Sequence, residues 1–288
     1  MKRHAITPAQ ALALSLTAAL AIVALKWGAW WTTGSVGFLS DALHSLVNVA
    51  GAGFAWLMVL FARRPPSAAY PFGYGKAEYF SAAFEGGLIA AAAAGILFAV
   101  GERIAHPHVL APLGTGTGLS VLAACLNLAV ARVLIRVGRA HHSLATEGDG
   151  RHLMADVWIT AGVILGVGAA GLTGWLWLDI AAALLVAVNL IRVGWLLVSR
   201  SLAGLLDAAW PGEDIERMQV RLRALESQGA SFGPLRTRRS GAWRFATVEL
   251  RVSPGCTVER ADAIAKSAER EASEEGAALL VRIVPADA

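Results

Sequence analysis

Long apolar segments follow one another through the first 200 residues, and short polar connections separate them. A helix needs about 20 mostly apolar residues to cross roughly 30 Å of hydrocarbon. Six segments meet this length: residues 11–31, 36–61, 80–100, 116–135, 154–172 and 175–197. The pattern therefore predicts an α-helical membrane protein whose six transmembrane helices occupy residues 1–207.

The remainder of the chain has a different pattern. Charged amphipathic segments at 213–226 and 258–275 predict two helices, and alternation of apolar and polar residues at 235–240, 243–252 and 278–284 predicts three strands. This order predicts a small α+β domain over residues 208–288, with two helices on one face of a sheet.

Composition supports this division. Of the 288 residues, 56% are hydrophobic and 16% are charged, whereas a soluble domain usually carries about 25% charged residues. The region 208–288 holds 24 of the 46 charged residues, 12 acidic and 12 basic. These values argue against a purely cytosolic enzyme and a disordered chain, and two cysteines without a CxxC pair argue against a disulfide scaffold.

Basic residues predict the orientation in the membrane. They gather on one side of the predicted spans: Lys2, Arg3, Arg63, Arg64, Lys76, Arg136, Arg139, Arg151 and Arg200. On the other side only Arg103 stands between the third and fourth spans. Lys and Arg favour cytoplasmic loops, so both termini are expected in the cytoplasm of a multi-pass protein, surrounded by lipid. The net charge of +4 lies in the membrane part, so no nucleic-acid partner is expected, and the compact architecture favours a bacterial plasma membrane.

Two predicted spans carry polar residues, which are costly in a bilayer. An Asp at a helix centre costs about 2.5–3.5 kcal/mol. The second span has His44 and Asn48, and the fifth region has His152 and Asp156. Residues four apart share a helix face, so the two pairs can close a four-coordinate site for a divalent cation. Asp41 can join this site or support it. The alternative is a polar helix–helix contact without a metal.

The motifs around these residues resemble the cation diffusion facilitator family. They are SDALHSLV at residues 40–47, FGYGKAE at 72–78 and HLMADV at 152–157. The six-span plan and a ferredoxin-like cytoplasmic domain also fit that family. Its members export divalent metals from the cytoplasm as homodimers and exchange them for protons by alternating access. The resemblance therefore implies a divalent-metal/proton antiporter that needs no cofactor, with the metal as cargo.

The resemblance also implies the transport ligands: His44, Asn48, His152 and Asp156. Asn48 departs from the pattern, because zinc-transporting members usually have Asp there and a neutral amide is a weaker ligand. Two histidines favour Zn²⁺, Fe²⁺ or Co²⁺ over hard cations. Zn²⁺ is therefore the first candidate, while Cd²⁺ and Mn²⁺ stay open.

Accessory sites of the family are not evident. Tyr70 and Tyr74 stand where members with a second metal site have His, and all seven histidines precede residue 208. We therefore expect the C-terminal domain to dimerise without strong metal sensing. The resemblance further implies an ion pair between Lys76 and Asp207.

Other polar residues receive weaker interpretations. Lys26 is expected to reach the membrane interface with its long side chain. Four histidines are interpreted as ordinary loop residues: His106, His108, His141 and His142. Two alternatives to transport stay open, namely a metal-binding membrane sensor or scaffold, and a membrane hydrolase with a metal-activated water.

Overall fold

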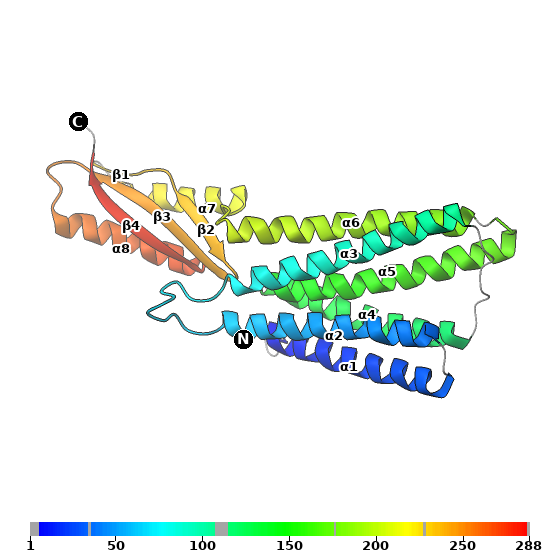
Figure 1. Ribbon diagram of the computed structural model, residues 1–288. Coiled ribbons are helices and arrows are strands. Elements are labelled where there is room, and N and C mark those ends of the chain that lie inside the picture. The colour runs from blue at the N-terminus through cyan, green and yellow to red at the C-terminus, as the bar shows by residue number, and fades with distance from the viewer. Residues whose placement is uncertain (1–5, 34–35, 107–114, 176, 227–228, 287–288) are drawn as a thin grey trace. The chain divides into compact units, whose positions relative to one another are not determined.

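The computed structural model describes residues 6–33, 36–106, 115–175, 177–226 and 229–286, without the side chains of 29–30, 32–33, 36–44, 115–117, 167 and 170–171. It divides into two compact units, Met1–Leu202 and Ala203–Ala288. Within the described residues, six long helices run alongside one another (Figure 1). They are α1 (Pro8–Thr33), α2 (Val36–Ala62), α3 (Ala77–Ala105), α4 (Thr115–Ala140), α5 (Leu144–Thr173) and α6 (Trp177–Leu205).

The helices have the length and polarity of membrane spans. In the described part of the chain, α1, α2, α3, α4 and α6 each contain an apolar segment long enough to cross a membrane. The helix α5 has 30 residues and lies in the same bundle. The helical bundle and the small C-terminal sheet confirm the predicted fold class.

The helix α5 begins at Leu144, ten residues before the predicted span. Sequence reasoning assigned its charged first turns to a loop, but tertiary contacts hold them in a helix. The Glu147 carboxylate, which is buried, accepts hydrogen bonds from Arg151 at 2.6 and 2.9 Å. It also lies 3.5 Å from the Arg139 side chain of α4. A buried charge is tolerated when it is paired in this way.

Apolar residues pack the bundle around α5. One buried cluster joins α1, α2, α4 and α5 and includes Leu12, Val59, Leu134 and Leu153. Another joins α3, α5 and α6 and includes Ile89, Ala155 and Leu190. Both clusters include residues of α5, so this helix packs against α1, α2 and α4 on one side and against α3 and α6 on the other. Its polar side chains therefore lie among those of neighbouring helices.

The second unit is an α+β fold built on one central strand. Its elements are α7 (Gly212–Ala224), β1 (Ala230–Phe232), β2 (Arg236–Ser240), β3 (Trp243–Val252), α8 (Val258–Glu274) and β4 (Ala277–Pro285). Strands β1 and β2 pair antiparallel with successive parts of β3, and β4 pairs parallel with it. The short strand β1 was not predicted from the sequence.

Alternation along β3 explains how the helices pack on this sheet. Ala246, Val248 and Leu250 are buried on one face of the strand, as expected when side chains alternate between the two faces. Met218 of α7 and Ala268 of α8 pack in the same cluster as Ala246 and Val248. The hydrophobic core of this unit therefore lies between the sheet and its two helices.

Candidate metal site

Side chains from α2 and α5 meet inside the helical unit. The Asn48 side chain donates a hydrogen bond of 2.5 Å from Nδ2 to Oδ2 of Asp156. Its Oδ1 atom lies 3.1 Å from Nε2 of His152. His152 and Asp156 lie four residues apart and share one face of α5. The amide of Asn48 thus contacts both members of the His152/Asp156 pair on α5.

His44 and Asp41 belong to the first half of α2. Their side chains lie outside the described residues, so their part in a metal site stays a prediction. Position 44 precedes Asn48 by four residues and shares its helix face. Among the residues that the structure does describe, no group of three His, Cys, Asp or Glu side chains is arranged to hold a metal ion.

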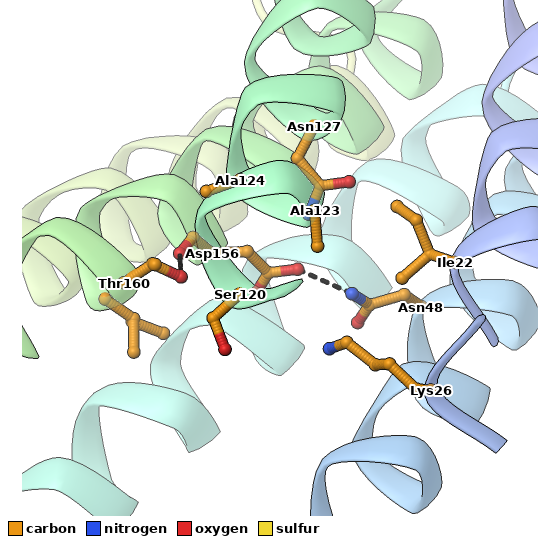
Figure 2. A pocket seen from close by; sticks show the side chains of 10 residues that line it. Ile22, Lys26, Asn48, Ser120, Ala123, Ala124, Asn127, Asp156 and Thr160 are labelled. Carbon is orange, nitrogen blue, oxygen red and sulfur yellow. Dashed lines mark hydrogen bonds between the residues drawn. The ribbon is translucent and has the colours of Figure 1, made fainter. Parts of the chain in front are cut away.

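A polar pocket adjoins these side chains. It has a volume of ≈ 110 Å³ and lies among α1, α2, α4 and α5. Figure 2 shows Asn48 and Asp156 meeting at its edge. Its other polar lining residues are Lys26, Ser120, Asn127 and Thr160. Since one water takes about 30 Å³ in the liquid, a cation with a few waters fits this volume.

Lys26 contributes to this pocket, although its position near the end of the first predicted span favours the membrane interface. It lies on α1, and Figure 2 shows its amino group directed toward Asn48. The position of a lysine in the sequence does not show whether its side chain enters a pocket between helices or reaches the membrane interface. Its location depends on how α1 packs against α2 and α4.

Two buried carboxylates near the site were missed by sequence reasoning. Glu85 of α3 is fully buried, and its Oε2 lies 3.3 Å from Nδ1 of His152. Asp149 of α5 is only 1% exposed. The signal for Glu85 was present, because an ionisable residue within a predicted span needs an explanation. Asp149 was missed because the fifth span was predicted to start too late.

The loop between α2 and α3 is held by aromatic contacts. The ring of Tyr74 lies 4.7 Å from that of Phe61 and 4.8 Å from that of Tyr70, measured between centroids. The Tyr74 hydroxyl hydrogen-bonds to Ser67 at 2.9 Å. The tyrosines at the positions of the family's second metal site thus have packing partners of their own.

The sequence also singles out Lys76, Asp207 and four loop histidines. Lys76 and Asp207 belong to different units, so their predicted ion pair stays a prediction. Within the second unit, Asp207 lies 3.5 Å from the Arg238 guanidinium. The His141 ring hydrogen-bonds to the backbone carbonyl of Val137 at 3.1 Å. Among the other loop histidines, His108 falls outside the described residues, and the roles of His106 and His142 stay open.

Two family models cover most of the chain. Residues 12–206 match the cation efflux transmembrane domain, and residues 210–278 match the cytoplasmic domain of cation efflux proteins. The chain belongs to the cation efflux family. This is the family of cation diffusion facilitators that the sequence motifs resemble, and its members are transporters. The cation efflux assignment confirms a multi-pass membrane transporter of cations rather than an enzyme, with the cation as cargo.

Relatives agree with the cation efflux assignment. An uncharacterized transporter of Synechocystis sp. is 38% identical over 261 residues, which cover 91% of this chain and 84% of the relative. The putative transporter MamV of Paramagnetospirillum magneticum is 30% identical over 94% of this chain and 81% of its own. The cation-efflux pump FieF of Salmonella arizonae is 28% identical over 90% of this chain and 86% of its own.

Proposed function

We propose that this cation efflux protein exchanges a transition-metal dication for protons across the membrane by alternating access, with Zn²⁺ as the first candidate. The proposed ligands are His44, Asn48, His152 and Asp156, with Asp41 joining or supporting them. The observation that carries the proposal is the contact of Asn48 with both His152 and Asp156. The relatives named as cation-efflux pumps favour the same activity.

The distances between the polar atoms support a metal site. Tetrahedral ligands about 2.1 Å from a Zn²⁺ ion lie roughly 3.4 Å from one another. The Nε2 atom of His152 and Oδ1 of Asn48 are already 3.1 Å apart. The Asn48–Asp156 hydrogen bond, at 2.5 Å, has to open for the cation. Small side-chain movements between α2 and α5 are therefore enough to replace hydrogen bonds by metal bonds.

Histidine chemistry supports exchange with protons. Only neutral imidazole binds a metal, so loading from the cytoplasm displaces protons from His44 and His152. After the bundle reopens on the other side, protons compete with the metal for the same nitrogen atoms. With a reference pKa of about 6.5, histidine is suited to exchange near neutral pH.

The proposal includes assembly and orientation. Residues 1–207 form the transport domain, and residues 208–288 form a cytoplasmic domain through which two chains associate as a homodimer. The match of residues 210–278 to the cytoplasmic domain of cation efflux proteins supports this role. Both termini then lie in the cytoplasm of a bacterial cell, as the distribution of basic residues indicates.

Liposomes that contain the purified protein, a pH dye and a metal dye test the transport proposal. Zn²⁺, Fe²⁺, Mn²⁺, Co²⁺ and Cd²⁺ are added in turn. We expect Zn²⁺ uptake with an opposing proton flux, and loss of both fluxes in Asp156→Ala and His152→Ala. The matched controls are Asp262→Ala in α8 and His141→Ala in the loop after α4, which should transport as the wild type does.

The outcomes separate the alternatives. Binding of metals without flux of any of them supports a membrane sensor or scaffold instead. Full transport by both Asp156→Ala and His152→Ala contradicts the proposed ligands, although it agrees with transport by the wild type. Absence of both binding and flux for every metal contradicts the proposed function itself.

A further inference from the structure

The side chain of Glu85 is buried without a compensating Lys or Arg among the contacts of the described residues. It lies on α3, is fully buried, and has neither carboxylate oxygen in a hydrogen bond to the described part of the chain. Its nearest ionisable partner is His152 of α5, at 3.3 Å from Oε2 to Nδ1. A carboxylate is costly to remove from water unless it is paired or protonated, and the His152 imidazole is the partner that this arrangement offers.

The two nitrogen atoms of the His152 ring face different groups. Nδ1 lies 3.3 Å from Oε2 of Glu85, without a hydrogen bond between the two, and Nε2 hydrogen-bonds to Oδ1 of Asn48 at 3.1 Å. A metal-binding histidine commonly donates its other ring N–H to a carboxylate. Such a partner determines which nitrogen carries the proton and which keeps a lone pair for the metal.

We propose that Glu85 is the positioning residue for His152: its carboxylate accepts a hydrogen bond from Nδ1–H, so that Nε2 presents its lone pair to the transported cation. This inference rests on the proposed function, and it adds a residue from a third helix, α3, to the pairs on α2 and α5. Glu85 acts through His152, because the imidazole ring lies between the Glu85 carboxylate and the Asn48 amide oxygen beside Nε2.

Gly51 makes room for this carboxylate. It follows Asn48 by three residues on α2, and a Cβ atom added there would lie 2.9 Å from Oε1 of Glu85. On α5, a Cβ at Gly148 would lie 3.6 Å from Cβ of Glu85. Gly53 differs, because its nearest neighbour would be a Leu16 methyl group at 4.0 Å. The close approach at Gly51 thus offers a second way to disturb Glu85 without changing its chemistry.

The test compares four single variants of the full chain, and the double variant Glu85→Gln/Gly51→Ala, in liposomes and in lipid nanodiscs. Glu85→Gln removes the carboxylate, and Gly51→Ala pushes against it. The matched controls are Glu78→Gln, another buried carboxylate of α3 that accepts a hydrogen bond from Ser143 at 2.5 Å, and Gly53→Ala. Zn²⁺ affinity is measured by calorimetry, and KM and kcat are measured from Zn²⁺ flux.

We expect Glu85→Gln to raise the Kd and KM for Zn²⁺ about 10- to 100-fold, the usual loss when a partner of a metal-bound histidine is removed. The kcat value should change much less, because the ligands themselves remain. Gly51→Ala should shift Kd in the same direction. The double variant should bind no more weakly than Glu85→Gln alone, since both changes act on one contact.

A lower thermal midpoint in Glu85→Gln with an unchanged Kd would show a purely structural role and overturn the inference. If Glu85→Gln does not fold, Gly51→Ala decides: a Kd equal to that of Gly53→Ala also overturns it. These results are distinct from a failure of the proposed function, which shows as a wild type without Zn²⁺ flux.

Discussion

The Asn48 amide on α2 bridges His152 and Asp156 of α5: its Nδ2 donates to Asp156 at 2.5 Å, and its Oδ1 lies 3.1 Å from Nε2 of His152. An amide can donate a hydrogen bond to a carboxylate, which an ionised Asp at this position cannot do. The residue that departs from the zinc-transporter pattern therefore stabilises the contact between α2 and α5. With Asn48 as a ligand of the cation, as proposed above, affinity for the cation and stability without the cation are linked at position 48.

Asn48→Asp should separate these two properties. Two carboxylates in contact repel one another, so the thermal midpoint without metal should fall, by about 2–4 °C for each kcal/mol lost in a domain of this size. The Kd for Zn²⁺ should decrease about tenfold, which corresponds to roughly 1.4 kcal/mol. Thermal unfolding with and without Zn²⁺, together with calorimetry, measures both effects.

The swapped variant Asn48→Asp/Asp156→Asn is the control for this prediction. It keeps one carboxylate and one amide, so its midpoint without metal should return toward the wild-type value. An equally low midpoint in the swapped variant would show that repulsion between carboxylates is not the cause.

Contact between α3 and α6 depends on two glycines. A Cβ at Gly86 would lie 3.1 Å from the carbonyl oxygen of Gly194, and one at Gly194 would lie 3.0 Å from that of Gly86. Small residues allow such close approach of helices in membranes. Gly86→Ala should lower the free energy of unfolding by about 1–3 kcal/mol through overpacking. Thermal unfolding in detergent measures this loss of stability. Gly87→Ala is the control, because a Cβ added at Gly87 would meet nothing within 4 Å.

Arg103 at the end of α3 pairs with Asp179 at the start of α6, at 2.6 Å. Both side chains are partly buried, with 26% and 11% exposed. Asp179→Ala leaves the guanidinium without this partner and should cost about 1.5–3 kcal/mol of stability. The double variant Arg103→Ala/Asp179→Ala should be more stable than Asp179→Ala, because it removes the uncompensated charge. A double-mutant cycle on the thermal midpoint measures this difference, and simple additivity would contradict it.

Trp210 stabilises the second unit. It is 3% exposed, its Nε1 donates to the Arg238 carbonyl at 3.0 Å, and the Arg244 guanidinium lies 4.2 Å from its ring centroid. Trp210→Ala should cost about 3–5 kcal/mol. Hydrogen–deuterium exchange of residues 236–252 in the full chain should therefore become faster. Trp243→Ala is the matched control, because Trp243 is 61% exposed and its removal should leave this exchange nearly unchanged.

The sequence by itself determined the local features of this protein. Apolar segments specify membrane helices, and alternation specifies β3, because both patterns follow from periods within one element. For the same reason, the spacing of His152 and Asp156 was enough to place them on one helix face. The charged first turns of α5 were misjudged, since the polarity of Glu147 and Asp149 suggests a loop until the helices that bury them are known.

Only the tertiary structure decided which helices supply the groups around that face. Asn48 reaches His152 and Asp156 across 104 and 108 positions of sequence, and Glu85 reaches His152 from a third helix. No local period encodes such contacts. They depend on where small residues leave room for a neighbouring helix, as Gly51 does for the Glu85 side chain, and this is determined by the packing of the whole bundle.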